Sequence, residues 1–277
     1  MCGKLSAYIM VSELPWLRES ICSYYDYVDK IVVTYDKDGL SWTRRPVDIT
    51  HCLQLLSEID VHNKMEFITG DFHTNVDPLV NDTAQRQFSY DAASSGADWV
   101  IQLDTDEIVQ NSETFLRKIA SASEVGASEL WFPSFWVYNT NNLVSLVYCD
   151  RIMRPVGGYP GPIALRPGAR LVCARQTDDR ARAFVVGKRR FIPFTSEFGF
   201  DSDVKYSDWI IHMSWVRQSS YFDEKARNNG HANDFDWFKE KIRWERSVKN
   251  PILHCAKTPF TRERQNYDRH TIWRKFP

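Results

Sequence analysis

Short apolar runs alternate with stretches of helical spacing through the first half of the chain. The apolar runs are residues 6–11, 30–35, 65–69 and 99–103. Their composition is typical of buried strands and predicts a parallel sheet. Between the first two runs, apolar residues recur every three or four positions, which predicts a helix with Pro15 in its first turn. Those apolar residues are Leu14, Leu17, Ile21, Tyr24 and Val28. Two more helices are expected, one within residues 77–95 and one from about residue 112.

Beyond residue 128 the sequence becomes strand-like, aromatic and interrupted by glycine and proline. The strand-like segments are residues 130–138, 169–175, 183–192 and 209–215. They predict a smaller mixed or antiparallel sheet region. Helices are expected over residues 219–228 and 235–248, with Asn229-Gly230 as a C-cap between them. No linker-like segment is visible, so we expect an α/β fold in one domain over residues 1–277, with a Rossmann-like sheet flanked by helices.

Composition narrows the class of protein. With 277 residues and 43% hydrophobic content, the chain can bury a sizeable core. No stretch approaches the ~18 to 20 apolar residues that cross a bilayer and no signal-like segment begins the chain, so we expect a cytoplasmic protein. The six cysteines form no C-x-x-C pair, which argues against a disulfide framework or a zinc knuckle.

Charge is divided unevenly along the chain. Residues 1–149 contain 10 Lys+Arg and 21 Asp+Glu, whereas residues 150–277 contain 25 and 15, giving −11 and +10. Two interpretations remain open. The halves attract each other within one compact domain, or the basic half faces the phosphate of a ligand.

Three carboxylates, Asp104, Asp106 and Glu107, directly follow the apolar run at residues 99–103. In open α/β sheets, ligands bind at the carboxyl ends of the strands. In an extended stretch Asp104 and Asp106 point to the same side, roughly 7 Å apart. Two such oxygen donors suit Mn²⁺ or Mg²⁺, which binds a substrate diphosphate. A D-x-D tripeptide also occurs in solvated turns, but the strand before this one and the helix after it favour a metal site.

This motif resembles the metal motif of the GT-A glycosyltransferases, in particular the family-2-like group with L-D-x-D-E at a strand end. Residues 8–35 look like the opening strand, helix and strand of that family, and residues 85–93 look like the helix before its metal motif. The resemblance implies that Asp36 and Asp38 contact the nucleoside and that Arg86 helps to hold the nucleotide. Residues after the second strand depart from the family's glycine-rich sequence, which leaves the base specificity open.

The resemblance also covers the segment around residues 209–215. In similar enzymes a histidine at the end of a late strand completes the metal site, and His212 has that position. Neutral imidazole is a competent ligand for Mn²⁺ beside carboxylates. A structural role for His212 is the alternative. Later basic residues can close over the diphosphate, and Lys225 and His231 are the candidates.

The family's acidic base motif has no clean match late in the chain. Glu197, Asp201 and Asp203 lie in the corresponding region and are candidates for the catalytic base, although each could equally be a loop residue. A carboxylate in that role would deprotonate the acceptor hydroxyl in an inverting reaction.

Taken together, the resemblance implies a metal-dependent transfer of a sugar, with inversion, from a UDP-sugar to an acceptor hydroxyl. Residues 1–127 would bind the nucleotide-sugar, and residues 128–277 would form the acceptor side and the C-terminal helices. Asp106 would hold the cation, with Asp104 near the ribose or the metal's waters, and Glu107 would join these two aspartates as a catalytic residue. A metal-dependent phosphohydrolase or nuclease is one alternative, although further ligands at clear spacings are missing. A non-catalytic module that binds a polyanion is the other.

The acceptor stays open between a saccharide, a lipid-linked glycan, a protein side chain and a modified nucleic acid. Aromatic residues beyond the metal motif could stack against it or could be core residues: Trp131, Phe132, Phe135, Trp136 and Tyr138. A cluster of basic residues would favour an anionic acceptor if it lines a groove: Arg166, Arg170, Arg175, Arg180, Arg182, Lys188, Arg189 and Arg190.

Overall fold

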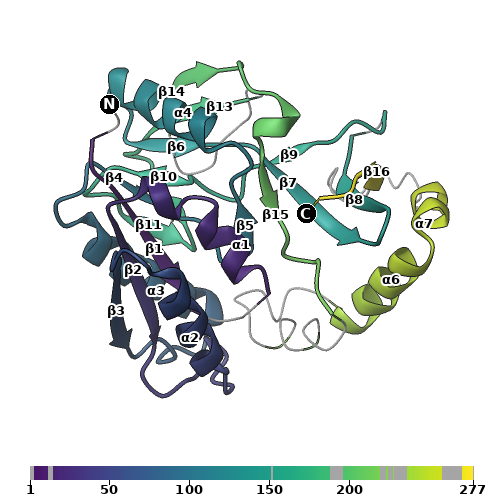
Figure 1. Ribbon diagram of the computed structural model, residues 1–277, viewed down its shortest axis with the longest axis horizontal. Helices are drawn as coiled ribbons and strands as arrows, with labels where there is room; N and C mark the ends of the chain where they lie inside the picture. Colours follow the sequence, from purple (N-terminus) through teal and green to yellow (C-terminus); the bar gives the residue numbers. More distant parts are fainter. Residues whose placement is uncertain are drawn as a thin grey trace.

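The computed structural model describes residues 3–11, 15–150, 152–187, 196–218, 223, 227, 236–257 and 270–276. Its largest element is an eight-stranded sheet in the order β14-β13-β6-β10-β4-β1-β2-β3 (Figure 1). These strands are β1 (Leu5–Met10), β2 (Lys30–Asp36), β3 (Met65–Gly70), β4 (Trp99–Ile101), β6 (Glu129–Trp131), β10 (Ala164–Leu165), β13 (Arg182–Val186) and β14 (Ser196–Asp201). β10 runs antiparallel to its neighbours β4 and β6, and the other neighbours pair in parallel. The predicted α/β fold with a mostly parallel sheet is therefore confirmed.

Helices cover both faces of the four-stranded parallel part of this sheet. On one face, Leu5, Ala7 and Ile9 of β1 pack in a core with α1 (Leu17–Cys22), α2 (Ile49–Ile59) and α4 (Ser112–Glu124). On the other face, Tyr8 and Met10 pack with α3 (Pro78–Ser94) and with the hairpin of β11 (Leu171–Cys173) and β12 (Gln176–Thr177). Both sides of β1 are buried, which explains its continuous apolar sequence.

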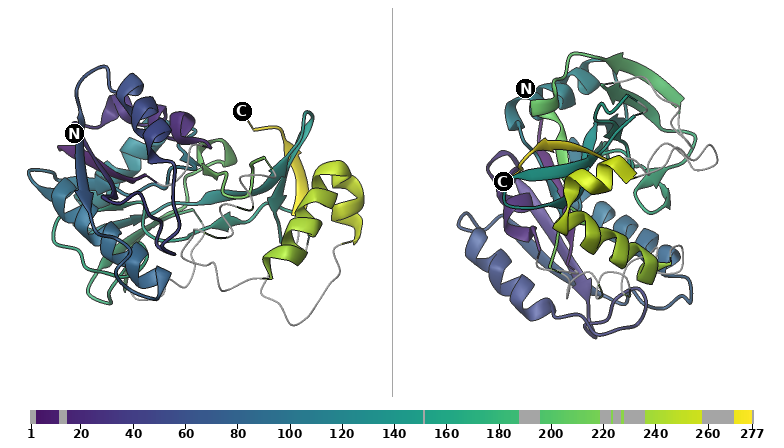
Figure 2. Two further views of the ribbon diagram at one scale, coloured as in Figure 1. Left: turned by 90° about the horizontal axis from the view of Figure 1, so that it is seen from below. Right: turned by 90° about the vertical axis from the view of Figure 1, so that its right-hand side faces the viewer.

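A second sheet is connected to the large one where the chain passes from β6 to the first long strand of the second sheet. Its strands are β5 (Glu107–Ile108), β7 (Ser134–Thr140), β8 (Val144–Tyr148), β9 (Gly157–Gly158), β15 (Ile210–His212) and β16 (His270–Arg274), with β9 paired to β7. Pro133 separates β6 from β7, so the single strand expected over residues 130–138 is divided between the two sheets. The helices α6 (Trp237–Lys249) and α7 (Pro251–Lys257) lie beside β7, β8 and β16, away from the parallel strands (Figure 2).

The helices match the sequence pattern in part. α3, α4 and α6 form where helices were expected. α1 is shorter than expected, because after Cys22 the chain continues into the 3-10 turn η1 (Tyr25–Tyr27). α2 was not predicted from the sequence, although Cys52, Leu56 and Ile59 have helical spacing and are buried. The helix expected over residues 219–228 lies largely outside the described residues. No helix in the described ranges is long and apolar enough to cross a bilayer.

α3 is unusual because its buried face is largely polar. The buried polar residues are Asn81, Asp82, Gln85, Arg86 and Ser89. Asp77 caps the helix by accepting a hydrogen bond from the N–H of Leu79 (2.9 Å), and Pro78 begins it. Hydrogen bonds from this polar face reach β2 through Thr34, whose hydroxyl lies 2.7 Å from that of Ser89. The helix is therefore held to the sheet by directional contacts as well as by apolar packing.

The C-terminal elements meet at a pair of histidines, of which His270 is buried and His254 is partly buried. His254 of α7 and His270 of β16 lie within hydrogen-bond distance (Nε2 to Nδ1, 3.0 Å), and the His270 ring stacks on Tyr138 with centroids 4.1 Å apart. Burial, together with Arg243, lowers the pKa of His254 to about 4. Burial also lowers the pKa of His270 well below its ordinary value. Both imidazoles are consequently neutral in the folded protein at neutral pH.

This pair predicts acid sensitivity. Below pH ~6.5 the imidazoles of the unfolded chain take up protons that the folded protein does not. The free energy of unfolding should therefore fall as the pH decreases from about 6.5 to about 4, by up to about 1.4 kcal/mol per pH unit for each imidazole. Urea titrations should show a smaller slope for His254→Phe/His270→Phe than for the wild type. The exposed His62→Phe is the control, and equal slopes for wild type and double variant would contradict the prediction.

Candidate metal centre

The residues after β4 form a tight turn rather than the extended stretch that the sequence suggested. The N–H of Glu107 donates to the carbonyl of Asp104 (3.0 Å), which closes the turn. The hydroxyl of Ser20, in α1, donates to the carbonyl of Glu107 (2.7 Å). The N–H of Met213 donates to the carbonyl of Asp106 (2.8 Å), which ties the turn to the segment after β15. The turn is thus fixed from two sides at the carboxyl end of β4.

Asp104, Asp106 and His212 converge at this turn. Each offers one donor atom, and these three atoms all lie within 4.8 Å of one another. The Nε2 of His212 is 3.3 Å from a carboxylate oxygen of Asp106. β15 pairs antiparallel with β5 so that His212 lies opposite Glu107, and this register brings the histidine to the turn. Two carboxylates and an imidazole are a ligand set that suits Mn²⁺ or Mg²⁺, so the residues fit a divalent cation.

Two buried arginines accompany the two aspartates. Arg86, from the middle of α3, places Nη2 2.9 Å from Asp104 and Nε 2.7 Å from Asp82. Arg217, five residues after His212, places Nη2 3.5 Å from Asp106. Arg86 therefore lies next to the metal motif, and its role in holding the nucleotide stays a prediction. Arg217 was not among the residues predicted from the sequence. No local sequence motif identifies Arg217, because its contact with Asp106 depends on how β15 packs beside the turn.

Glu107 is not available to a ligand. Its side chain is fully buried, and both carboxylate oxygens accept hydrogen bonds from Arg175, at 2.6 Å each. One oxygen also accepts the N–H of Asp104 (3.0 Å). Arg175 additionally donates to the carbonyl of Gln102 (3.1 Å). Glu107 therefore shapes the turn from inside, and its proposed catalytic role changes to a structural one.

These charges determine the protonation of the site. Burial favours the neutral form of Asp104, but Arg86 and Arg175 outweigh it and lower the pKa of this carboxyl below its ordinary value. Burial disfavours protonated His212, but Asp106 outweighs it and raises the pKa of the imidazole. The aspartate is thus ionised at neutral pH, as metal binding requires.

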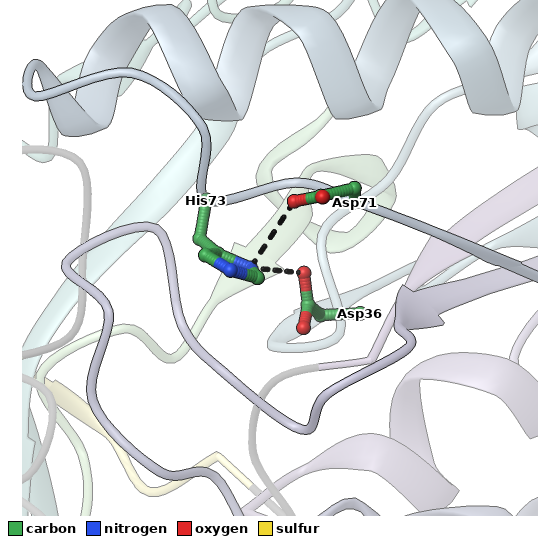
Figure 3. Close-up of side chains that lie close together, drawn as sticks. All are labelled: Asp36, Asp71 and His73. Atoms are coloured by element: carbon green, nitrogen blue, oxygen red, sulfur yellow. Dashed lines mark hydrogen bonds and ion pairs between the residues drawn. The ribbon is translucent and has the colours of Figure 1, made fainter.

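A second group, Asp36, Asp71 and His73, also has donor atoms within 4.8 Å of one another (Figure 3). The carboxylate of Asp36 accepts four hydrogen bonds, from the backbone N–H of Asp38 (2.9 Å), Leu40 (3.2 Å) and Phe72 (2.9 Å) and from Nδ1 of His73 (2.8 Å). Burial alone would raise the pKa of Asp36, but these bonds lower it. Asp36 therefore links the loops after β2 and β3, and Asp38 and His73 are more exposed than Asp36 itself.

The structure does not bring Asp201 and Asp203 to the metal centre. Asp201 is in β14 and pairs with the fully buried Lys118 (2.5 Å), and Asp203 is exposed and 3.8 Å from Arg117. Because β13, β6 and β10 lie between β14 and β4, the separation is about 19 Å at the usual strand spacing. Lys118 holds the pKa of Asp201 below its ordinary value despite partial burial. The ion pair with Lys118 indicates a structural role for Asp201. Both Asp201 and Asp203 are too far from the metal centre to contact a ligand there.

Three other predicted site residues cannot be placed. Lys225 and His231 lie outside the described residues, and the side chain of Glu197 does as well. Their roles stay predictions from the sequence.

Most of the aromatic residues proposed to bind the acceptor are core residues. Trp131, Phe132, Phe135 and Tyr138 are all at most 1% exposed. Trp136 is the exception among the five, because it is partly exposed and its ring centroid lies 5.7 Å from that of His212.

The basic cluster is distributed over separate contacts. Arg175 is buried against Glu107, the guanidinium of Arg166 lies 5.3 Å from the centroid of Trp99, and Arg180 pairs with Asp178. The segment with Lys188, Arg189 and Arg190 lies outside the described residues. An anionic acceptor stays a prediction from the sequence alone.

Comparisons with known proteins do not identify a family. No model of a known protein family matches the chain, and no curated protein matches it. The solved structures with partial likeness include three that illustrate its extent. They are 4-diphosphocytidyl-2C-methyl-D-erythritol synthase from Anaerococcus prevotii (14% identity, TM-score 0.35, 60% of this chain and 70% of that chain), mannose-6-phosphate isomerase from Helicobacter pylori (11%, 0.30, 51% and 58%) and mannose-1-phosphate geranyltransferase from Thermus thermophilus (9%, 0.27, 60% and 51%). Likenesses this partial identify neither the family nor the reaction, so the function must be inferred from the site.

The geometry predicts that His212 is a metal ligand. His212→Ala should weaken the affinity for Mn²⁺ at least about tenfold, the loss seen even for outer-shell partners, while the melting temperature changes little. Titration by electron paramagnetic resonance measures free Mn²⁺ directly. His73→Ala, which removes the histidine of the other carboxylate group, is the matched control. A variant that loses only thermal stability would establish His212 as a structural residue.

Proposed function

We propose that this chain is a metal-dependent glycosyltransferase of the GT-A type that moves a sugar from a nucleotide-sugar, first of all a UDP-sugar, to an acceptor hydroxyl. The observation that supports this most is the convergence of Asp104, Asp106 and His212 at the carboxyl end of β4. That edge of a mostly parallel sheet is where α/β proteins bind ligands. The L-D-x-D-E sequence at the same place resembles the family's metal motif.

The charges around the turn suit a diphosphate. Four carboxylates (Asp82, Asp104, Asp106 and Glu107) are compensated by three guanidinium groups (Arg86, Arg175 and Arg217). Mn²⁺ or Mg²⁺ bound by Asp104, Asp106 and His212 would stabilise the charge that develops on the leaving nucleoside diphosphate. Arg86 and Arg217 keep both aspartates oriented and add positive charge beside them. With a divalent cation bound, the four negative charges, the three guanidinium charges and the two charges of the metal would sum to +1 where the donor's anionic group would lie.

The phosphohydrolase or nuclease alternative has less support. Two-metal hydrolases place their cations about 3.5 to 4 Å apart. In the described part of the chain, the second carboxylate–histidine group lies at the ends of β2 and β3, which are two and three strand positions from β4. Its Asp36 already accepts four hydrogen bonds. A single cation beside arginines fits stabilisation of a departing diphosphate better.

Ligand binding tests the proposal without an acceptor. UDP and Mn²⁺ together should raise the melting temperature by several degrees, because a ligand at 100 times its Kd stabilises the folded state by about 2.7 kcal/mol. UDP without metal should give a smaller rise. If UDP with Mn²⁺ leaves the melting temperature unchanged and the protein hydrolyses p-nitrophenyl phosphate, the protein is instead a phosphohydrolase.

Loss of Asp106 tests the chemistry. Asp106→Asn should lower metal-dependent turnover of the sugar nucleotide at least about 100-fold, comparable to the loss of one transition-state contact in other enzymes. Release of UDP from a panel of sugar nucleotides is the measurement, and circular dichroism checks the fold. The exposed Asp179→Asn is the matched control. Undiminished turnover by folded Asp106→Asn would refute the assignment.

A further inference from the structure

We propose that Arg175 is a positioning residue for the metal centre. Through Glu107 it would hold the turn after β4 in the shape that brings Asp104, Asp106 and His212 together. This inference rests on the proposed function, because it assumes that a divalent cation binds there. Arg175 is 2% exposed, and its guanidinium donates hydrogen bonds to the carboxylate of Glu107 and to the carbonyl of Gln102. Its charge acts on Asp104 from a distance, but its hydrogen bonds reach the turn through Glu107.

One carboxylate transmits the effect. The two oxygens of Glu107 receive the two Nη groups of Arg175, in the planar two-pronged arrangement that only a guanidinium offers. The same carboxylate accepts the backbone N–H of Asp104. Its other neighbour is His212, whose Nδ1 lies 3.9 Å away and whose backbone pairs with that of Glu107. A displaced Glu107 would therefore move one ligand directly and release the strand that positions another.

Arg175 is itself anchored in the fold. It lies in the turn between β11 and β12, and the N–H of its neighbour Ala174 donates to the hydroxyl of Thr83 in α3 (2.8 Å). The carbonyl of Arg175 accepts from the side chain of Gln102 (3.0 Å). Gly161 gives the side chain room, because a Cβ there would lie 2.5 Å from Cγ of Arg175. The backbone of Arg175 is therefore held in place, and this fixes the position from which the guanidinium reaches Glu107.

Stability alone does not explain this pair. Taking both charges out of water costs several kcal/mol per ion, and apolar replacement of a buried ion pair is often neutral or stabilising. What an apolar pair cannot do is accept the N–H of Asp104 and orient the turn. Outer-shell partners of this kind typically change metal affinity 10- to 100-fold.

The sign of the effect separates positioning from simple electrostatics. Arg175→Met removes a positive charge near a cation site, so Coulomb's law alone predicts tighter binding of Mn²⁺. Positioning predicts the opposite, a 10- to 100-fold weaker affinity measured by electron paramagnetic resonance on the metal-free protein titrated with Mn²⁺. Arg175→Lys keeps the charge without the two-pronged geometry, and it should bind Mn²⁺ about as weakly as Arg175→Met.

A double variant covers the case in which the unpaired Glu107 unfolds the protein. Arg175→Met/Glu107→Leu removes both charges and should recover thermal stability without recovering Mn²⁺ affinity. The matched control is the buried pair Lys118–Asp201, four strand positions from β4. Lys118→Met/Asp201→Leu should leave Mn²⁺ affinity at the wild-type value whatever its stability.

The outcomes are distinct. Wild-type or tighter Mn²⁺ binding by Arg175→Met, or by the double variant if the single one does not fold, overturns the inference. So does wild-type binding by Arg175→Lys, which would show that the two-pronged geometry is not needed, and so does a wild-type protein that binds no Mn²⁺. If the wild type binds Mn²⁺ and the variants lose it, but no sugar nucleotide is turned over, the inference stands and the proposed glycosyltransferase activity fails.

Discussion

Compensation of buried negative charge organises this molecule. Carboxylates gathered at the end of β4 are stable away from water only if cations and hydrogen-bond donors meet them there. The compensating groups come from three places: Arg86 from α3, Arg175 from the β11–β12 hairpin and Arg217 from the segment after β15. Each of these elements must dock correctly for the charges to balance. The arrangement of the site therefore depends on the correct packing of these three elements, and the charges of the site in turn require that packing.

The sequence predicts the parallel strands well because they are buried on both sides and so are continuously apolar. It predicts the mixed region less well, because strand pairing there depends on distant segments. Pro133 illustrates this, since one apolar aromatic run crosses from the large sheet into the second. β16 pairs with β8, which lies more than 120 residues earlier in the chain, and no local sequence pattern predicts such a contact.

The same division holds for the candidate site. Asp104 and Asp106 are visible in the sequence because one strand end presents both, and His212 is visible because an apolar strand precedes it. Arg175 appeared only as one of many basic residues, and its function follows from a contact 68 residues away. Glu107 was predicted to take part in catalysis, because sequence cannot show that a carboxylate is enclosed by a guanidinium. Burial, and not residue type, distinguishes the candidate metal ligands from the residues that hold the turn in place.

The polar buried face of α3 has a consequence for how this sequence can diverge. Apolar positions in a helix–sheet contact exchange for one another if volume is kept. Gln85 receives the indole N–H of Trp42 (2.7 Å), and Arg86 binds Asp82 and Asp104, so a change at either leaves a buried partner unsatisfied. These positions should therefore vary together or not at all among descendants of the gene. Joint variation at residues 42, 82, 85, 86 and 104 would mark lineages that have given up this site while retaining the sheet.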